Sequence, residues 1–461
     1  MTTNASAKTE LEQARALFQQ KDFAAAIDIL QSILNNKPKT FDACYLLAVN
    51  FEASGDLLLA ETTFLKALAI DNSSGITFHS LANVQKRLGK VAEADKNFQK
   101  AISTVNPSAL YFFDYGVFLG EQGKLKQALD AHLQVLEIDS SQSEVYLYIF
   151  KHFMCLHRYQ DAIEIADIGL LCQNLDDFQL YELLISKAIL FWLFDNIEEA
   201  VQAIVLSEGI NTLEEGHANL KTMKVFHGYI KRLLVYRQQH SEVYQDTQAS
   251  DLPLIYFISE SHGFAPNGMT VNYQQQSHLI KSLFISGTKM VHLIQQSSNQ
   301  YNVSLTTLLR GLPEQSSVVL GFGEIDCRPD EGIFKHCKQQ GIDFHKVVDG
   351  MVEKYIALLT AQANKYKLNI MVYGIPAPHP IMVNMLAQEQ QAEFKQMIAY
   401  LNQQLAIFCK KEQLVFLDVY TLTNVEGISN LKYHSDSSHV NPSTVPELFE
   451  LIAANSDQLI H

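Results

Sequence analysis

Positive charge is scarce in this sequence of 461 residues. Lysine and arginine together number 35, against 50 aspartate and glutamate residues, which gives a formal net charge of -15 at pH 7. A protein that binds nucleic acid needs a basic surface to meet the phosphates, and an anionic lipid surface attracts basic segments in the same way. The composition therefore argues against both nucleic acid and anionic membranes as partners.

Long apolar runs and paired cysteines are also missing. No apolar run reaches about 18 residues, so we expect no membrane span. The first twenty residues contain no basic region followed by an apolar core, so we do not expect them to form a secretory signal. Cysteines without any CxxC pair are typical of reduced thiols in the cytoplasm. The six cysteines of this chain are scattered in that way: Cys44, Cys155, Cys172, Cys327, Cys337 and Cys409.

Apolar residues, by contrast, are abundant. Hydrophobic residues make up 47% of the chain and include 26 Phe and 19 Tyr. This is enough material for large cores, and it gives no sign of global disorder. At roughly 100–200 residues per domain, the length suggests two to four domains.

Internal repetition organises the first half of the chain. When the sequence is laid out in rows of 34 residues from Ala7, five rows align without a gap. The eighth position reads Ala14, Ala48, Ala82, Gly116, Phe150, the fifteenth reads Lys21, Gly55, Gly89, Gly123, His157, and the twentieth reads Ala26, Ala60, Ala94, Ala128, Ala162. Small residues at the eighth and twentieth positions let two antiparallel helices approach closely. Glycine at the fifteenth suits a turn in which φ is positive.

This pattern resembles the tetratricopeptide repeat, a helix pair of 34 residues, over roughly residues 7–210. A sixth, displaced row has Ala188 and Ala200 at its eighth and twentieth positions. Residues from about 214 to 247 are expected to form closing helices, so the repeat domain is predicted to span 7–247. Such arrays are solenoids with a concave face. The resemblance implies a groove for a protein or peptide ligand; a spacer or a dimerisation arm is the alternative.

The apolar pattern changes after the polar stretch at 241–251. Short apolar runs at 252–259, 281–287, 317–323, 368–376 and 413–420 alternate with helix-like segments near 343–364 and 387–411, and a final helix is expected after Pro442. This alternation predicts a mostly parallel sheet between two layers of helices, a three-layer α/β/α domain at 251–461. The predicted fold class of the chain is therefore an α-solenoid followed by an α/β domain. Ligands of such sheets bind beyond the carboxyl ends of the strands.

Polar residues follow these runs in an order that resembles the SGNH, or GDSL-type, hydrolases. That family usually has Gly-Asp-Ser in its first block and Asp-x-x-His in its last. Here the first block reads Ser259-Glu260-Ser261-His262 and the last reads Asp436-Ser437-Ser438-His439. Between them lie Gly287 and the segment GEIDCR at 323–328. This segment is similar to a third block of bacterial proteins of this type, some of them joined to repeats or to glycan-related domains.

The resemblance implies a serine esterase or acyl transferase that needs no cofactor and no metal. A serine hydroxyl is a poor nucleophile at neutral pH and needs a base within hydrogen-bond reach. Ser261 would be the nucleophile, His439 the base, and Asp436 the group that orients the imidazole and stabilises its cation. The backbone N–H groups of Ser261 and Gly287 would hold the oxyanion.

The third block departs from the family pattern. The family usually supplies an asparagine side chain there as an oxyanion donor, and the alignment puts Gly323 in its place. Arg328, a permanent cation with several donors, could substitute. Glu324, Asp326 and Arg328 alternate along what we expect to be an extended segment, so all three would face one side. They would form either a substrate-binding network at the pocket mouth or a buried structural ion pair.

Each triad residue also has a structural interpretation. Ser261 could be a helix N-cap, His439 a surface histidine, and Asp436 or Gly287 a turn residue. For Ser261 the N-cap role and the nucleophilic role are compatible with each other.

Other nearby side chains allow further interpretations. His262 is assigned to the substrate-binding side of the site by the resemblance. Together with His434 and Cys327 it also raises the question of zinc, but ligands spread over three loops do not fit the usual spacings. No neighbour marks Cys327 as an activated nucleophile. His379, in the proline-rich loop 374–380, is interpreted as structural.

The sequence thus predicts a cytoplasmic protein with a repeat arm for a protein or peptide partner and a serine-dependent esterase or acyl transferase domain. A small acylated substrate, such as an O-acetylated glycan, fits this prediction by analogy. A binding or scaffold protein with a degenerate hydrolase-like domain is the alternative, favoured by the missing asparagine. A glycosyltransferase is disfavoured, because 251–461 is short for two nucleotide-binding lobes and holds no glycine-rich phosphate loop.

Overall fold

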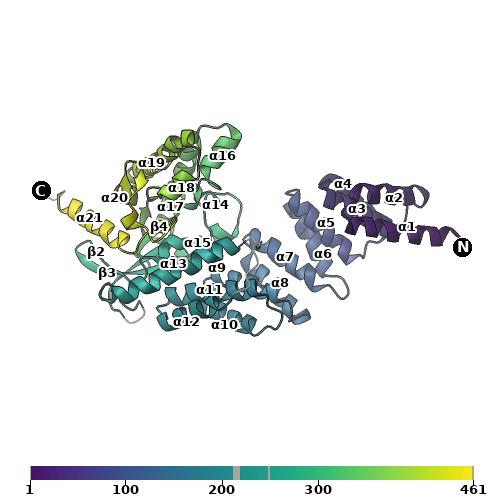
Figure 1. Cartoon of the computed structure of the whole chain (residues 1–461), viewed down its shortest axis with the longest axis horizontal. Coiled ribbons are helices and arrows are strands. Elements are labelled where there is room, and N and C mark those ends of the chain that lie inside the picture. The colour runs from purple at the N-terminus through teal and green to yellow at the C-terminus, as the bar shows by residue number, and fades with distance from the viewer. Residues whose placement is uncertain (1, 211–216, 218, 248–249, 459–461) are drawn as a thin grey trace. The chain divides into compact units, whose positions relative to one another are not determined.

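The computed structural model describes residues 2–210, 217, 219–247 and 250–458 (Figure 1). Parts of the predicted closing segment and of the predicted boundary therefore lie outside the described residues. The chain divides into two compact units, residues 1–148 and 149–461. The last repeats thus belong to the same unit as the strands, whereas the sequence placed the domain boundary between 247 and 251. No helix among the described residues is both long and apolar enough to cross a bilayer.

The first unit consists of antiparallel helix pairs. Its helices are α1 (Thr2–Gln19), α2 (Phe23–Asn36), α3 (Phe41–Ser54), α4 (Leu57–Ile70), α5 (Gly75–Arg87), α6 (Val91–Ile102), α7 (Ala109–Glu121), α8 (Leu125–Ile138) and the start of α9 (Ser143–Cys155). The predicted small contact residues lie between paired helices, and the alanines at the twentieth position have no exposed surface. At Gly116 a Cβ atom would lie 2.5 Å from the His132 ring. The helix-pair array predicted from the spacing is confirmed.

The turn position of each repeat adopts positive φ, as predicted. Glycine accepts this conformation without cost, whereas other residues are strained there by about 1 kcal/mol or more. The residues concerned are Lys21, Gly55, Gly89, Gly123, His157 and, in the displaced sixth row, Asp195, with φ between 57° and 92°. The shared backbone geometry confirms the register of the sixth row.

The second unit begins with the remaining helices of the repeats. These are the rest of α9, then α10 (Tyr159–Leu170), α11 (Asp177–Leu193), α12 (Ile197–Glu208) and the long helix α13 (Leu220–Gln239), followed by the 3₁₀-helix η1 (Ser241–Val243). Figure 1 shows α13 beside the strands of the same unit.

A six-stranded sheet forms the centre of this unit. Its order is β2-β3-β1-β4-β5-β6, with strands at Leu254–Ser259 (β1), Thr270–Tyr273 (β2), Gln276–Phe284 (β3), Ser317–Gly321 (β4), Asn369–Tyr373 (β5) and Val415–Leu417 (β6). Neighbouring strands are parallel except β2, which pairs antiparallel with β3. The sequence predicted five of these strands and missed β2. A short hairpin of β7 (Asn424–Val425) and β8 (Ile428–Ser429) lies apart from this sheet.

Helices cover both faces of the sheet, and consecutive residues of β4 and β5 are accordingly buried on both sides. On one face, Ile258 and Leu320 pack in a core with the helices α14 (Met290–Leu293), α15 (Gln300–Gly311), α16 (Ile333–Gln340), α17 (Phe344–Tyr366), α18 (Pro380–Asn384) and α19 (Gln388–Lys411). On the other face, Phe257 and Val319 pack with α21 (Thr444–Gln458), with α20 (Val419–Thr423) beside it.

The last repeat helices also pack onto the sheet region. Trp192 on α11 is fully buried and donates a 2.9 Å hydrogen bond from Nε1 to the carbonyl of Phe264. Asn267 in turn donates from Nδ2 to the carbonyl of Trp192 at 2.9 Å. Tyr229 of α13 and Phe284 of β3 belong to the same apolar cluster. Residues on both sides of the predicted boundary therefore share one core.

Candidate active site

The carboxyl end of β1 is the point at which the sheet order reverses. Strand β3 lies on one side of β1 and β4 on the other, so the loops leaving β1 open a crevice at this edge. Ser259, the last residue of β1, is in register with Phe284 of β3 and Gly321 of β4. The segments that follow, which carry Ser261, Gly287 and Glu324, therefore leave the sheet side by side.

Three side chains form a continuous hydrogen-bonded chain at this edge. Ser261 Oγ lies 2.9 Å from His439 Nε2. On the opposite side of the ring, His439 Nδ1 lies 3.0 Å from Asp436 Oδ2 and 3.1 Å from Oδ1. Ser261 and His439 are buried, with 4% and 1% of their surface exposed. Residues 178 positions apart in the sequence are thus in direct contact.

Asp436 is held in place by several donors. Its Oδ1 accepts the backbone N–H groups of Ser438 and His439, both at 2.8 Å, and its Oδ2 accepts from Arg232 of α13. Burial opposes ionisation of Asp436, but the hydrogen bond and charge of His439 outweigh it and hold the pKa of the carboxyl well below its usual range. Asp436 is therefore an anion fixed against Nδ1, which requires that nitrogen to carry a proton.

The Ser261 hydroxyl has a second acceptor. Ser261 begins the 3₁₀-helix η2 (Ser261–Phe264), whose N-cap is Glu260 and not Ser261. Glu260 Oε2 accepts from Ser261 Oγ at 2.9 Å and from the backbone N–H of His262 at 3.2 Å. A hydroxyl has one proton, so Glu260 and His439 compete for it. The capping role proposed for Ser261 is taken by its neighbour.

His262 is a buried cation paired with Glu260. Its Nδ1 lies 2.8 Å from Glu260 Oε1 and its Nε2 lies 2.8 Å from the carbonyl oxygen of Ser438. Both partners only accept, so both ring nitrogens donate and the ring is charged. Burial acts against this charge, but the Glu260 carboxylate raises the pKa of His262 to about 9. Burial likewise acts against ionisation of Glu260, and His262 overcomes it and lowers the pKa of Glu260 to about 2.

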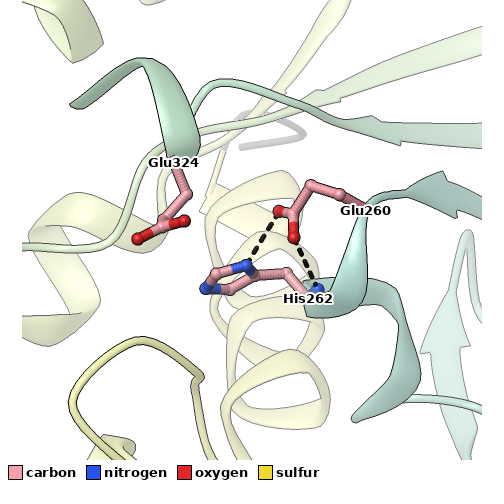
Figure 2. Close-up of side chains that lie close together, drawn as sticks. All are labelled: Glu260, His262 and Glu324. Carbon is pink, nitrogen blue, oxygen red and sulfur yellow. Dashed lines mark hydrogen bonds and ion pairs between the residues drawn. The ribbon is translucent and has the colours of Figure 1, made fainter. Parts of the chain in front are cut away.

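Glu260, His262 and Glu324 also resemble a metal-ligand cluster, because their potential ligand atoms all lie within 4.8 Å of one another. Figure 2 shows the carboxylate of Glu324 near the His262 ring and the two bonds between Glu260 and His262. A metal ligand must be a neutral imidazole nitrogen, whereas each nitrogen of His262 already donates a proton. The donor set therefore fits a proton-bearing ion pair better than a metal.

The third block folds differently from the prediction. Ile325–Cys327 forms the 3₁₀-helix η3 and Glu324 is helical, so the segment is not extended and its side chains do not alternate. Glu324 pairs with Arg328 at 2.9 Å, a helical i,i+4 contact. Asp326 points elsewhere and accepts from the backbone N–H of Met290 at 2.7 Å. The expectation that Glu324, Asp326 and Arg328 face one side is wrong, because a turn replaces the strand spacing.

The two candidate oxyanion glycines differ in their surroundings. Gly287 has positive φ and lines the cavity next to Ser261. Gly323 has φ of 125°, and a Cβ atom there would lie 2.4 Å from Met290 Cε and 2.7 Å from Ile375 Cδ1. A side chain at position 323 would thus point into packed core, which explains why glycine stands there. The described residues that line the cavity include Gly287 but not Gly323.

Ser261 and His439 open onto a cavity of about 440 Å³. Helix α13 forms one wall through Lys221, Thr222, Val225 and Phe226, and Arg328 forms part of another. Arg328 reaches this cavity, as Lys221 and Lys289 also do, and its side chain is 27% exposed. A second cavity of about 470 Å³ shares Thr222, Phe226, Ser286 and Gly287 with the first. Together they provide room for a substrate larger than an acetyl ester.

Several residues that the sequence analysis singled out have structural roles. Burial raises the pKa of the Cys327 thiol well above its usual value, the opposite of activation. Burial and the neighbouring His379 lower the pKa of His434 to about 4. His379 caps α18, accepting from the N–H of Ile381. No disulfide joins any of the six cysteines among the described residues.

Sequence reasoning missed two residues that contact the triad. Tyr229 stacks on the His439 ring and Arg232 binds Asp436, both from the helix interpreted only as a closing element. Neither position carries a signal in the sequence, because a tyrosine and an arginine are ordinary residues of an amphipathic helix.

Comparison with known proteins supports the repeats in the N-terminal part of the chain. The tetratricopeptide repeat family matches residues 11–75. Cellulose synthase operon protein C of Escherichia coli is 30% identical over 133 residues, which covers 28% of this chain and 12% of that protein. TPR repeat-containing protein YpiA of Bacillus subtilis is 26% identical over 172 residues, covering 35% and 37%.

Among solved structures, that of Pseudomonas aeruginosa pilF has 17% identity and a TM-score of 0.41, covering 49% of this chain and 99% of that one. This chain spans between 12% and 37% of the curated relatives above. The helix pairs of the N-terminal region are tetratricopeptide repeats, an architecture for protein interaction.

Proposed function

We propose that the protein is a serine-dependent ester hydrolase or acyl transferase of the SGNH type. The observation that carries the proposal is the 2.9 Å contact between Ser261 Oγ and His439 Nε2, with Asp436 on the other ring nitrogen. A nucleophile, a base and a group that orients the base, each within hydrogen-bond reach of the next, are the parts that covalent acyl transfer requires.

The reaction follows from this arrangement. Ser261 Oγ forms a bond to the ester carbonyl carbon while its proton passes to His439 Nε2, and the carbonyl electron pair moves onto the oxygen. Asp436 stabilises the imidazolium that results. Collapse of the intermediate breaks the bond to the leaving alcohol, which takes the proton from His439 and leaves an acyl-serine. Water or another hydroxyl then repeats these steps to release the acyl group.

We propose two backbone groups as donors to the oxyanion. The N–H of Ser261 and the N–H of Gly287 follow adjacent strands at the same edge. Arg328, held by Glu324, is the group we propose as the third donor, since position 323 has no side chain. Losing one such donor costs on the order of 100- to 1000-fold in rate. The proposed enzyme should therefore be slow if Arg328 does not reach the oxyanion.

The substrate and the partner are proposed by analogy. The sequence resemblance favours a small acyl group carried by a glycan, and the two cavities that share lining residues support a substrate of about that size. For the repeats we propose a protein or peptide ligand. Within the first unit, a cavity of about 1070 Å³ lined by residues of α4 to α7, among them Leu68, Phe78 and Tyr111, is large enough for several side chains of a peptide.

The experiment compares wild type with Ser261→Ala and His439→Ala on 4-nitrophenyl acetate and with a fluorophosphonate probe. We expect hydrolysis and covalent labelling by wild type, and loss of both in each variant. Labelling that persists in Ser261→Ala would remove Ser261 as the nucleophile. A wild type that neither hydrolyses nor labels would favour a binding protein, which the glycine at 323 also supports.

A further inference from the structure

Tyr229, in the middle of α13, lies flat on the imidazole of His439. The two ring centroids are 3.9 Å apart and the ring planes differ by 8°. Tyr229 is fully buried, and its hydroxyl has no hydrogen-bond partner among the described residues. The contact therefore depends on the ring and not on the hydroxyl. An aromatic face in this position fixes the plane of the imidazole and attracts the ring when it becomes a cation.

Arg232, three residues further along α13, holds the third member of the triad. Its Nη2 donates to Asp436 Oδ2, the oxygen that also faces His439 Nδ1. Gly228, one turn earlier, makes room for this guanidinium, since a Cβ there would lie 3.2 Å from Arg232 Nη1. The Arg232 side chain is 44% exposed and borders a groove of about 540 Å³.

Helix α13 is itself firmly attached to the strand region. Tyr229 packs on Phe264, at the end of the turn that begins with Ser261, with ring centroids 6.1 Å apart. Phe264 in turn receives the hydrogen bond of Trp192. A helix fixed in this way can set the orientation of the side chains that it presents.

We propose that Tyr229 and Arg232 are positioning residues for His439 and Asp436, so that the last helix of the repeat region is part of the catalytic apparatus. The proposal rests on the proposed function of Ser261. Tyr229 acts by keeping the imidazole in the plane that joins Ser261 Oγ to Asp436, and by stabilising the imidazolium in the transition state. Arg232 acts by fixing the position of the Asp436 carboxylate; its charge offsets part of that of Asp436 and so affects the pH dependence rather than the positioning.

The test measures hydrolysis of 4-nitrophenyl acetate by Tyr229→Leu, Tyr229→Phe, Arg232→Gln and Arg232→Lys. We expect Tyr229→Leu and Arg232→Gln each to lower kcat about tenfold, as loss of an interaction worth 1.36 kcal/mol does, with KM changed less than twofold. Phe keeps the stacked ring and Lys keeps the cation, so these two variants should recover most of the loss. The matched control is Lys231→Gln on the same helix, whose side chain pairs with Glu208 away from the site.

A pH profile separates positioning from a general structural role. Removing the Arg232 cation leaves the Asp436 carboxylate freer to stabilise the imidazolium, so the acid limb of kcat/KM should move to higher pH. We expect a shift of about half a pH unit, since the guanidinium is partly exposed and screened. Among the described residues, Glu260 and His262 are charged groups close to His439, and their pKa values of about 2 and about 9 lie outside this limb. The charged side chains that line the same cavity, which are unchanged in the variant, are Lys221, Lys289, Arg328, Asp330 and Glu331.

The outcomes separate this inference from the proposed function. If Ser261→Ala still labels, the proposed function fails and the inference with it. If Ser261→Ala is inactive but Tyr229→Leu and Arg232→Gln behave like Lys231→Gln, the inference alone is wrong. The inference is also wrong if Tyr229→Phe and Arg232→Lys recover none of the lost kcat and Arg232→Gln leaves the acid limb of kcat/KM in place. If Tyr229→Leu fails to fold, as judged by circular dichroism, Arg232→Gln and Arg232→Lys decide whether the inference holds.

Discussion

Replacing Glu260 by glutamine removes the carboxylate that neutralises the buried cation of His262. The pKa of His262, about 9 against an ordinary 6.5, corresponds to about 3 kcal/mol at 1.36 kcal/mol per pKa unit. The lowered pKa of Glu260 reflects the same attraction and is not added. Both side chains are almost completely buried, so solvent does not reduce this value. Breaking a buried ion pair by removing one partner costs a similar amount, about 3–5 kcal/mol.

The effect should depend on pH in a defined direction. Because the pKa of His262 is raised in the folded state, its contribution to stability is complete below pH 6.5 and is lost as the pH rises through 9. We therefore expect Glu260→Gln to lower the free energy of unfolding by about 3 kcal/mol at pH 6. The deficit should shrink toward zero above pH 9, where His262 is neutral in wild type as well.

The single tryptophan provides the assay. Trp192 is fully buried in the unit that holds the site, so its fluorescence during urea denaturation reports on that unit. Asp343→Asn is a matched control, because Asp343 accepts from Nδ1 and the backbone N–H of His345 at 2.7 and 3.0 Å, but on the surface. Its loss should cost less than about 1 kcal/mol. Equal deficits at pH 6 and pH 9.5, or a control as damaging as Glu260→Gln, would refute the reasoning.

Four further variants test other parts of the structure. Asp436→Asn keeps the shape but not the charge that stabilises the imidazolium, so kcat for 4-nitrophenyl acetate should fall by about 1000-fold or more; a loss below tenfold would contradict the triad. Gly323→Ala should lower the free energy of unfolding by about 2 kcal/mol or more in the tryptophan assay, since φ is positive and Met290 blocks the new Cβ. In the first unit, Lys21→Gly should raise thermal stability, by about 1 kcal/mol, and Gly89→Ala should lower it by a similar amount, measured by circular dichroism; the same sign for both would contradict the shared turn geometry.

Local regularities explain what the sequence could predict. The repeats were found because alanine recurs every 34 residues where helices touch, and each such contact lies within one helix pair. The strands were found because buried parallel strands are short apolar runs. The contact of Ser261 with His439 was expected because the order of the sequence blocks resembles that of a known family. The sequence alone gave no distance between the two residues.

Other features depend on partners that sequence patterns do not reveal. Strand β2 is short and pairs only at the edge, so its apolar signal is weak. Residues Ile325–Cys327 form a turn and not the predicted extended segment, and this turn brings Asp326 to the backbone N–H of Met290 in α14, 36 residues away. Arg232 and Asp436 are 204 residues apart. A helix that closes a repeat array and a helix that supports a triad have the same apolar spacing, so the sequence could not distinguish them.

The shared core around Trp192 limits how this architecture can be varied. Repeats ahead of residue 149 lie in a separate compact unit, so they can be duplicated, lost or exchanged during evolution without altering the hydrogen bonds of Trp192. The helix pairs after that point cannot be exchanged so freely, since a recombination event at residue 250 would strip the strand region of the surfaces that cover Phe264, Phe284 and the His439 ring. We therefore expect the segment that must be inherited as one piece to begin within the repeats and not at the start of the strand region.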